Sequence, residues 1–111
     1  MSRLGEVLER VAAVIAERRG ADPATSWSAR LLADRTLAAR KVAEEAMEMA
    51  LAAGLDDRPA VIAESADLIY HWLALLAGAG VTLDEVAAAL EAREGRSGIE
   101  EKASRPGSGS S

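Results

Sequence analysis

The sequence predicts an all-α fold, built as a bundle of four to five helices in one small domain. The 111 residues are 50% hydrophobic but only 3% aromatic, with no Phe and no Cys. A core made mainly of Ala and Leu favours helices, because small side chains let helix backbones pack closely. Apolar residues also recur at helical spacing in stretches that Gly, Pro, Asp and Ser separate. The lack of Cys excludes a disulfide scaffold, a thiolate metal site and a cysteine nucleophile.

The first half of the chain contains three of the expected helical segments. Residues 4–19 place their apolar side chains on one helical face, which predicts an ordinary amphipathic helix. The turn-rich residues 20–26 end that helix, and residues 27–32 are expected to form a short helical piece. A second long helix follows over residues 36–54.

The second half begins with clear start signals. Asp57 is expected to cap a third long helix, with Pro59 near its first position and an end near residue 78. Thr82 and Glu85 form the capping-box pattern of a fourth long helix, which runs to about residue 93. We therefore expect a helical domain over residues 1–96 and a C-terminal tail, partly disordered, over residues 97–111.

The overall charge disfavours two classes of partner. The net charge is −5 at pH 7, whereas nucleic acids and anionic membranes attract basic surfaces. We expect no nucleic-acid and no membrane partner, although small anions can bind where cations gather. The first residues lack the apolar run of a signal peptide, and Glu6 and Glu9 are unlike a transit peptide, so we expect a cytoplasmic protein.

Acidic residues on the second and third long helices carry the most chemical information. On the helix over residues 36–54, a polar stripe lies between apolar borders and holds Lys41, Glu44, Glu45 and Glu48. The helix over residues 59–78 is apolar almost all the way round, except for one stripe that holds Glu64, Asp67 and His71. Charges on such a helix are costly unless they are paired or bind a metal.

The spacing of these acids predicts a metal site. The pairs Glu45/Glu48 and Glu64/Asp67 are each three residues apart, and they would face each other across two antiparallel helices. Four carboxylates select a hard cation, Mg²⁺ or Mn²⁺, over zinc or copper. Because Mg²⁺ commonly completes its ligand shell with substrate phosphates, a phosphate-handling site follows.

Several alternatives stay open at this point. The acids could form a solvated face paired with Lys41, Arg40 and Arg58. The single histidine excludes a di-iron bundle, which needs two Glu-x-x-His motifs. His71 is more simply a hydrogen-bonded core residue than a direct metal ligand. Core or subunit-interface positions are the simplest interpretation of Trp27, Trp72, Met47 and Met49.

Four segments together carry a resemblance to a known family. They are SWSARLL at residues 26–32, KVAEEAME at 41–48, ESADLIYH at 64–71 and RSGIEEKASR at 96–105. The acids of the two middle segments are similar to those of the all-α nucleoside triphosphate pyrophosphohydrolases, the MazG-like superfamily. All four segments together resemble the phosphoribosyl-ATP pyrophosphohydrolase family, and the resemblance extends over about residues 4–105.

The resemblance implies an activity and an assembly. The expected reaction is the Mg²⁺-dependent hydrolysis of 1-(5-phosphoribosyl)-ATP to 1-(5-phosphoribosyl)-AMP and pyrophosphate, the second step of L-histidine biosynthesis, by a cytoplasmic homodimer. A separate phosphoribosyl-AMP cyclohydrolase is expected for the next step. A dimer also agrees with the third long helix, whose apolar surface so short a chain cannot cover alone. The alternatives are a house-cleaning pyrophosphohydrolase that acts on free nucleoside triphosphates and a non-catalytic helical interaction module.

The resemblance also implies roles for single residues. The implied metal ligands are Glu45, Glu48, Glu64 and Asp67, and the implied catalytic carboxylates are Glu44 and Glu45. The residues expected to bind substrate phosphates are Arg30, Lys41, Arg96, Lys102 and Arg105. The last three would close over the phosphates if the tail reaches across a dimer interface.

Overall fold

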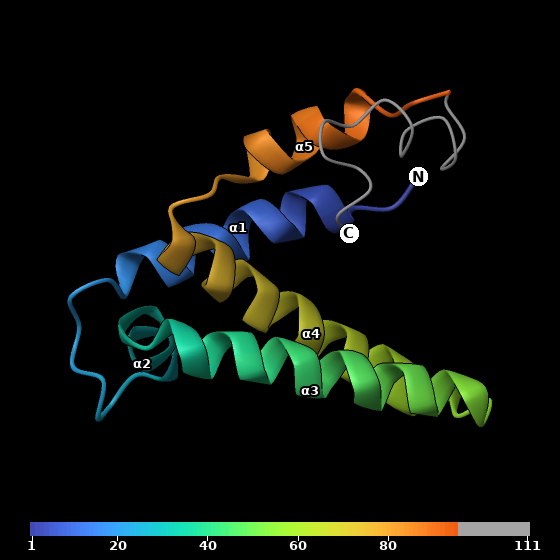
Figure 1. Cartoon of the computed structure of the whole chain (residues 1–111), viewed down its shortest axis with the longest axis horizontal. Coiled ribbons are helices and arrows are strands. Elements are labelled where there is room, and N and C mark those ends of the chain that lie inside the picture. The colour runs from blue at the N-terminus through green and yellow to red at the C-terminus, as the bar shows by residue number, and fades with distance from the viewer. Residues whose placement is uncertain (96–111) are drawn as a thin grey trace, which may run out of the picture. The chain divides into compact units, whose positions relative to one another are not determined.

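The computed structural model describes residues 1–95, and this part of the chain contains five α-helices and no strand (Figure 1). The all-α prediction is therefore confirmed. The described residues divide into two units, Met1–Val81 and a second that begins at Thr82. The helices are α1 (Leu4–Glu17), α2 (Trp27–Ala33), α3 (Arg35–Gly54), α4 (Arg58–Ala79) and α5 (Leu83–Glu91). The tail predicted from residue 97 lies outside the described residues.

Polar side chains set the starts of α2 and α3. The Ser26 side chain accepts a hydrogen bond from the backbone N–H of Ala29 and so caps α2. Asp34 adopts an extended conformation between the two helices, and its side chain accepts a hydrogen bond from the N–H of Leu37. One non-helical residue therefore separates the short α2 from the long α3, which lets the chain change direction there.

α3 and α4 form the helical hairpin that carries the predicted acids, and they lie side by side in Figure 1. Their connection is only the three residues between Gly54 and Arg58. Asp57 caps α4 by accepting a hydrogen bond from the N–H of Ala60 at 3.2 Å, and Pro59 stands in the first turn, as predicted. So short a connection makes the two helices antiparallel.

The core of the first unit contains small side chains. Ile15 and Leu31 are its largest fully buried residues, and the other buried apolar residues are Ala29, Ala38, Ala52, Leu73 and Ala74. Alanines at these positions let α2 and α3 approach α4 closely. As a result α4 contacts α1, α2 and α3, and most extensively α3.

Two arginines bind the carboxyl end of α4. Arg19 donates to the carbonyl oxygen of Ala77 at 2.9 Å, and Arg35 donates to that of Gly78 at 2.7 Å. The last carbonyls of a helix have no partner within the helix and carry partial negative charge, so cations there are stabilising. Gly80 then ends α4 in the left-handed conformation, with φ 73°.

Apolar side chains are nevertheless exposed along the hairpin. Met47, Leu51, Leu55 and Ile62 are 67%, 63%, 81% and 61% exposed. By length and composition alone α4 could also cross a membrane. In the described structure, however, α4 is the helix that the three others of the first unit contact, and it carries Glu64, Asp67 and His71.

The second unit begins with α5. The Thr82 side chain accepts from the backbone N–H of Glu85 at 3.1 Å, and the Glu85 side chain accepts from the N–H of Thr82 at 2.9 Å. The predicted capping box is therefore confirmed. The Glu85 carboxylate accepts from the backbone N–H of Thr82 and, at 3.1 Å, from its hydroxyl, and both hydrogen bonds favour the charged form and lower the pKa of Glu85.

Candidate metal and phosphate site

The α3–α4 hairpin brings three of the predicted carboxylates together. Glu45 and Glu48 come from α3 and Glu64 comes from α4, and one oxygen from each lies within 4.8 Å of the other two. We call these three residues the acidic cluster. Glu45 is buried, at 8% exposure, while Glu64 is half-buried and Glu48 is exposed. The cluster therefore has a closed inner side and an open outer side.

Glu64 is the electrostatically unusual member of the acidic cluster. Its Oε2 atom is buried and has no hydrogen-bond partner. The side chains of Glu45 and Glu48, together with burial, raise the pKa of Glu64 to about 7. A like-charged carboxylate disfavours the ionised form of its neighbour, whereas a cation between them would favour it. Three convergent carboxylates, one with a free buried oxygen, form a donor set that fits a hard divalent cation.

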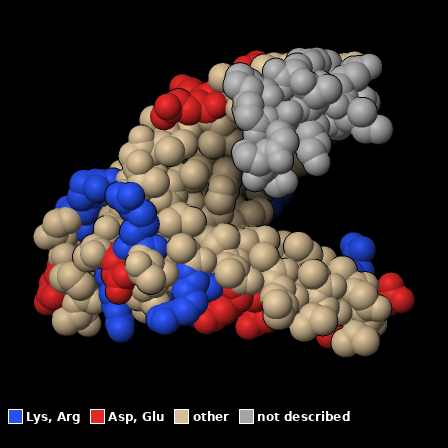
Figure 2. All heavy atoms as spheres, in the orientation of Figure 1, with Lys and Arg blue, Asp and Glu red and all other residues tan. Residues whose placement is uncertain are grey.

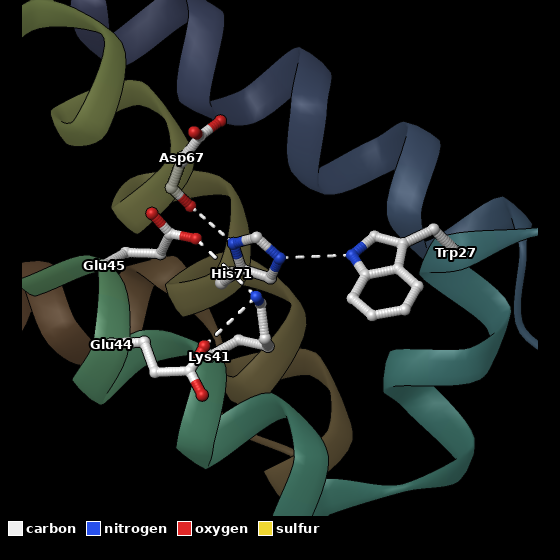
Figure 3. A network of polar contacts seen from close by, with 6 residues as sticks. All are labelled: Trp27, Lys41, Glu44, Glu45, Asp67 and His71. Carbon is white, nitrogen blue, oxygen red and sulfur yellow. Dashed lines mark hydrogen bonds and ion pairs between the residues drawn. The ribbon is translucent and has the colours of Figure 1, made fainter. Parts of the chain in front are cut away.

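Lys41 lies beside Glu45, the buried member of the acidic cluster (Figure 3). Its Nζ is 3.2 Å from Oε2 of Glu44 and 3.9 Å from Oε1 of Glu45. The hydrogen bond to Glu44 and the nearby charges raise the pKa of Lys41. Glu44 itself is exposed, and its carboxylate is not part of the cluster.

Asp67 is the predicted ligand that the structure leaves apart. It lies three residues after Glu64 on α4, but its side chain is exposed and its carboxylate is outside the cluster. Figure 3 shows this carboxylate directed away from Glu45. The convergence expected for four acids is thus seen for three of them.

His71 is buried, at 7% exposure, and both of its ring nitrogens have partners. Trp27 donates its indole N–H to Nε2 of His71 at 3.1 Å, and Nδ1 of His71 lies 2.7 Å from the carbonyl oxygen of Asp67 (Figure 3). Neither nitrogen is free to bind a metal. The interpretation of His71 as a hydrogen-bonded core residue is therefore confirmed.

The predicted phosphate-binding residues are described only in part. Arg30 is exposed on α2, and its Cζ lies 5.6 Å from the centroid of the Trp27 ring. Figure 2 shows Lys and Arg side chains gathered towards the α2 end of the first unit, beside an acidic patch on α3. Arg96, Lys102 and Arg105 lie outside the described residues.

The pairing of Trp27 with His71 is a feature of the site that the sequence does not predict. At 41% exposure Trp27 is not a core residue, and its alternative interpretation as a subunit-interface residue stays a prediction. The two residues are 44 positions apart, and no helical period connects them. A buried His on an apolar helix does need polar partners, and this requirement is the one signal in the sequence that pointed towards such a pairing.

The family model described as phosphoribosyl-ATP pyrophosphohydrolase matches residues 8–94. A phosphoribosyl-ATP pyrophosphatase of Caulobacter vibrioides (strain NA1000 / CB15N) is 59% identical over 103 residues, which cover 93% of this chain and 96% of that protein. The protein of that name from Caulobacter sp. (strain K31) is 56% identical over 96% of this chain and 99% of its own length. That of Paracoccus denitrificans is 54% identical over 88% of this chain and 92% of its own length.

Proposed function

The chain belongs to the phosphoribosyl-ATP pyrophosphohydrolase family, and we propose that it performs the reaction of that name with a divalent cation held by the acidic cluster. It is a hydrolase of histidine biosynthesis that cleaves a phosphoanhydride. The products are 1-(5-phosphoribosyl)-AMP and pyrophosphate. The single observation that carries the metal proposal is the free buried oxygen of Glu64 between two further carboxylates.

Glu45, Glu48 and Glu64 would hold the cation, which we propose to be Mg²⁺, with Mn²⁺ as a substitute. We include Asp67 among the proposed metal ligands because residues three apart share a helical face, so Asp67 lies on the same side of α4 as Glu64. When bound, Mg²⁺ neutralises charge on the substrate phosphates and on the departing pyrophosphate. The carboxylates, which come from both α3 and α4, would hold the ion between these two helices.

Glu44 and Glu45 are the proposed catalytic carboxylates. Lys41 occupies Oε2 of Glu44, so Oε1 is the atom that would accept a proton from the attacking water. Glu45 is the buried member of the cluster, and its position between Lys41 and Glu64 suits it to orient that water as well as to bind the ion.

Lys41 and Arg30 would bind the phosphates on the side of the acidic cluster nearest α2. Lys41 is already within hydrogen-bond reach of Glu44, so a bound phosphate would share its ammonium group. Arg30 presents a planar guanidinium, which suits two phosphate oxygens at once. Arg96, Lys102 and Arg105 are proposed as further cations from the C-terminal tail.

We also propose that the protein is a cytoplasmic homodimer. Next to the acidic cluster, one face of α3 forms an apolar hollow of about 310 Å³ that Met47, Leu51 and Ala43 line together with Glu44 and Glu48. Exposed apolar side chains in contiguous patches are typical of subunit interfaces. A second copy packed on this face would cover Met47 and Leu51 and bring its own residues close to the metal site.

The deciding experiment measures pyrophosphate release with Mg²⁺ from phosphoribosyl-ATP and from a panel of free nucleoside triphosphates. We expect phosphoribosyl-ATP to be the preferred substrate by a large factor in kcat/KM. We also expect Glu64→Gln to abolish release, while Glu91→Gln, an exposed acid on α5, leaves it unchanged. Preference for free triphosphates would instead support the house-cleaning alternative.

A further inference from the structure

We propose that His71 is a positioning residue for substrate binding, because it fixes the Trp27 ring on which the Arg30 guanidinium rests. The inference rests on the proposed function, in which Arg30 binds substrate phosphates. It adds a residue that does not touch the substrate and has no free nitrogen to offer it.

The hydrogen bonds of His71 define one protonation state of its ring. The indole N–H of Trp27 can only donate, so Nε2 of His71 must accept. The carbonyl oxygen of Asp67 can only accept, so Nδ1 must carry the proton and donate. His71 is therefore a neutral imidazole with its proton on Nδ1, and both partners depend on that arrangement.

The bond to His71 restrains a ring that would otherwise be loosely held. Trp27 is 41% exposed and is the first residue of α2, a helix of only seven residues. Its ring meets the His71 ring edge to face, with 6.2 Å between the centroids. A half-exposed side chain at a helix start has several accessible rotamers, and the hydrogen bond selects one of them.

The selected position of Trp27 determines where Arg30 can go. Arg30 is three residues after Trp27, on the same face of α2, with its Cζ 5.6 Å from the Trp27 centroid. A guanidinium over an indole face is attracted by the ring. The flexible Arg30 side chain therefore has a defined resting place only while the ring stays in position.

The same bonds connect Arg30 to the helix that carries part of the metal site. Nδ1 of His71 holds the carbonyl of Asp67, and Asp67 lies three residues after Glu64 on α4. The contacts therefore run from Asp67 on α4 through His71 and Trp27 to Arg30. Figure 3 shows Asp67, His71 and Trp27. These contacts set the position of a phosphate-binding cation relative to Glu64.

Three variants test the inference. His71→Phe keeps a ring but removes the acceptor, and Trp27→Phe keeps a ring beneath Arg30 but removes the donor. For both we expect KM for phosphoribosyl-ATP to rise about tenfold with kcat within about twofold, because a lost ground-state contact changes binding. His71→Gln retains an acceptor that can reach Trp27, so we expect it to restore KM to within about threefold of the wild-type value.

The matched control is Tyr70→Phe. Tyr70 OH and Ser28 Oγ are 2.6 Å apart and form another side-chain link between α2 and α4. The Phe ring keeps the edge contact with His71, whose centroid is 5.1 Å from that of Tyr70. We expect no change of KM in Tyr70→Phe. An equal rise there would mean that any weakening of α2 against α4 has the effect, and it would overturn the specific role of His71.

A binding measurement separates this inference from the proposed function. Calorimetric titration with inorganic pyrophosphate in Mg²⁺ buffer needs no turnover and no knowledge of the substrate. We expect Kd to rise about tenfold in His71→Phe and Trp27→Phe, to stay within about threefold of wild type in His71→Gln, and to stay unchanged in Tyr70→Phe. If the wild type binds pyrophosphate in this pattern but does not hydrolyse phosphoribosyl-ATP, the proposed function fails and the role of His71 stands.

A spectroscopic readout reports the hydrogen bond between Trp27 and His71 directly. The indole N–H signal of Trp27 in a ¹⁵N spectrum, assigned by its loss in Trp27→Phe, should shift when His71 loses its acceptor and return in His71→Gln. If His71→Phe does not fold, Trp27→Phe and His71→Gln carry the test. An unshifted indole signal, or a fall in kcat at constant KM, would overturn the inference.

Discussion

Glu64 shows how neighbours change the chemistry of one carboxyl group. It has the same side chain as Glu45 and Glu48, but it projects from the opposite helix towards both of them. Its pKa of about 7 follows from those two carboxylates and from burial. Without a cation, a rise of pH forces like charges together in this cluster. With a cation, the same carboxylates would serve as its ligands under the proposed function.

A pH dependence of stability follows for the metal-free protein. Because the folded-state pKa of Glu64 is raised from 4.5 to about 7, the folded state binds the proton more tightly than the unfolded state. Protonated Glu64 therefore contributes to the free energy of unfolding. This contribution is fully present below pH 4.5 and is lost as the pH rises to about 7. Urea denaturation in EDTA should therefore show the free energy of unfolding losing the Glu64 contribution between pH 4.5 and about 7. Glu64→Gln should flatten the fall, and an unchanged slope would contradict the pKa assignment.

Mg²⁺ should reverse this loss above pH 7. A ligand that binds only the folded state at about one hundred times its Kd stabilises it by about 2.7 kcal/mol. Thermal unfolding at pH 8 should show this gain in the wild type, and Glu45→Gln, Glu48→Gln and Glu64→Gln should lose it. Asp67→Asn tests whether the fourth acid takes part, and Glu91→Gln on α5 is the control. Full stabilisation in Asp67→Asn would remove Asp67 from the ligand set.

At the scale of elements, the α3–α4 hairpin depends on its three-residue connection and on the cap at Asp57. The cap satisfies one N–H in the first turn of α4, at Ala60. Glu64 is in the second turn after this start, so the cap and the acidic cluster belong to the same end of α4.

Removal of the Asp57 cap should therefore weaken the hairpin. We expect Asp57→Ala to lower the free energy of unfolding by about 1 kcal/mol, and Asp57→Ser to keep most of it, since Ser also caps helices. Urea denaturation of the two variants beside the wild type measures the difference. Equal losses in both variants would mean that the carboxylate acts by its charge rather than as a cap.

The caps also explain which parts of the fold could be predicted. Asp57 and Thr82 act on the backbone three residues away, so their sequence signals are local, and both helix starts were predicted. The convergence of Glu45 with Glu64 followed from helical spacing and a short connection. The direction of the Asp67 carboxylate could not be predicted, because spacing fixes the face of a helix but not a side-chain rotamer. Nor could the contact of Trp27 with His71, which depends on how α2 packs against α4.

At the scale of the whole molecule, the first unit buries few large side chains. Only Ile15 and Leu31 are large and fully buried in the described residues, while Met47, Leu51 and Ile62 are exposed on the hairpin. A chain with this distribution has apolar surface left for a partner. The proposed homodimer would bury it next to the acidic cluster.

Disrupting that surface should separate the subunits. We expect Leu51→Glu to shift the molecular mass measured by light scattering from dimer to monomer and to lower kcat/KM at least tenfold. Ala16→Glu places the same charge at an exposed position on α1 and should stay dimeric. A monomeric wild type with full activity would contradict the dimer proposal.

The two arginines at the carboxyl end of α4 have a consequence for how the first unit responds to alkali. Guanidinium groups keep their charge at every pH that cells meet, so Arg19 and Arg35 continue to bind the carbonyls of Ala77 and Gly78. Glu64, towards the opposite end of the same helix, changes its charge near neutrality. Alkaline titration without metal should thus loosen the hairpin from its Glu64 end, and amide hydrogen exchange should record protection that persists longest around Ala77.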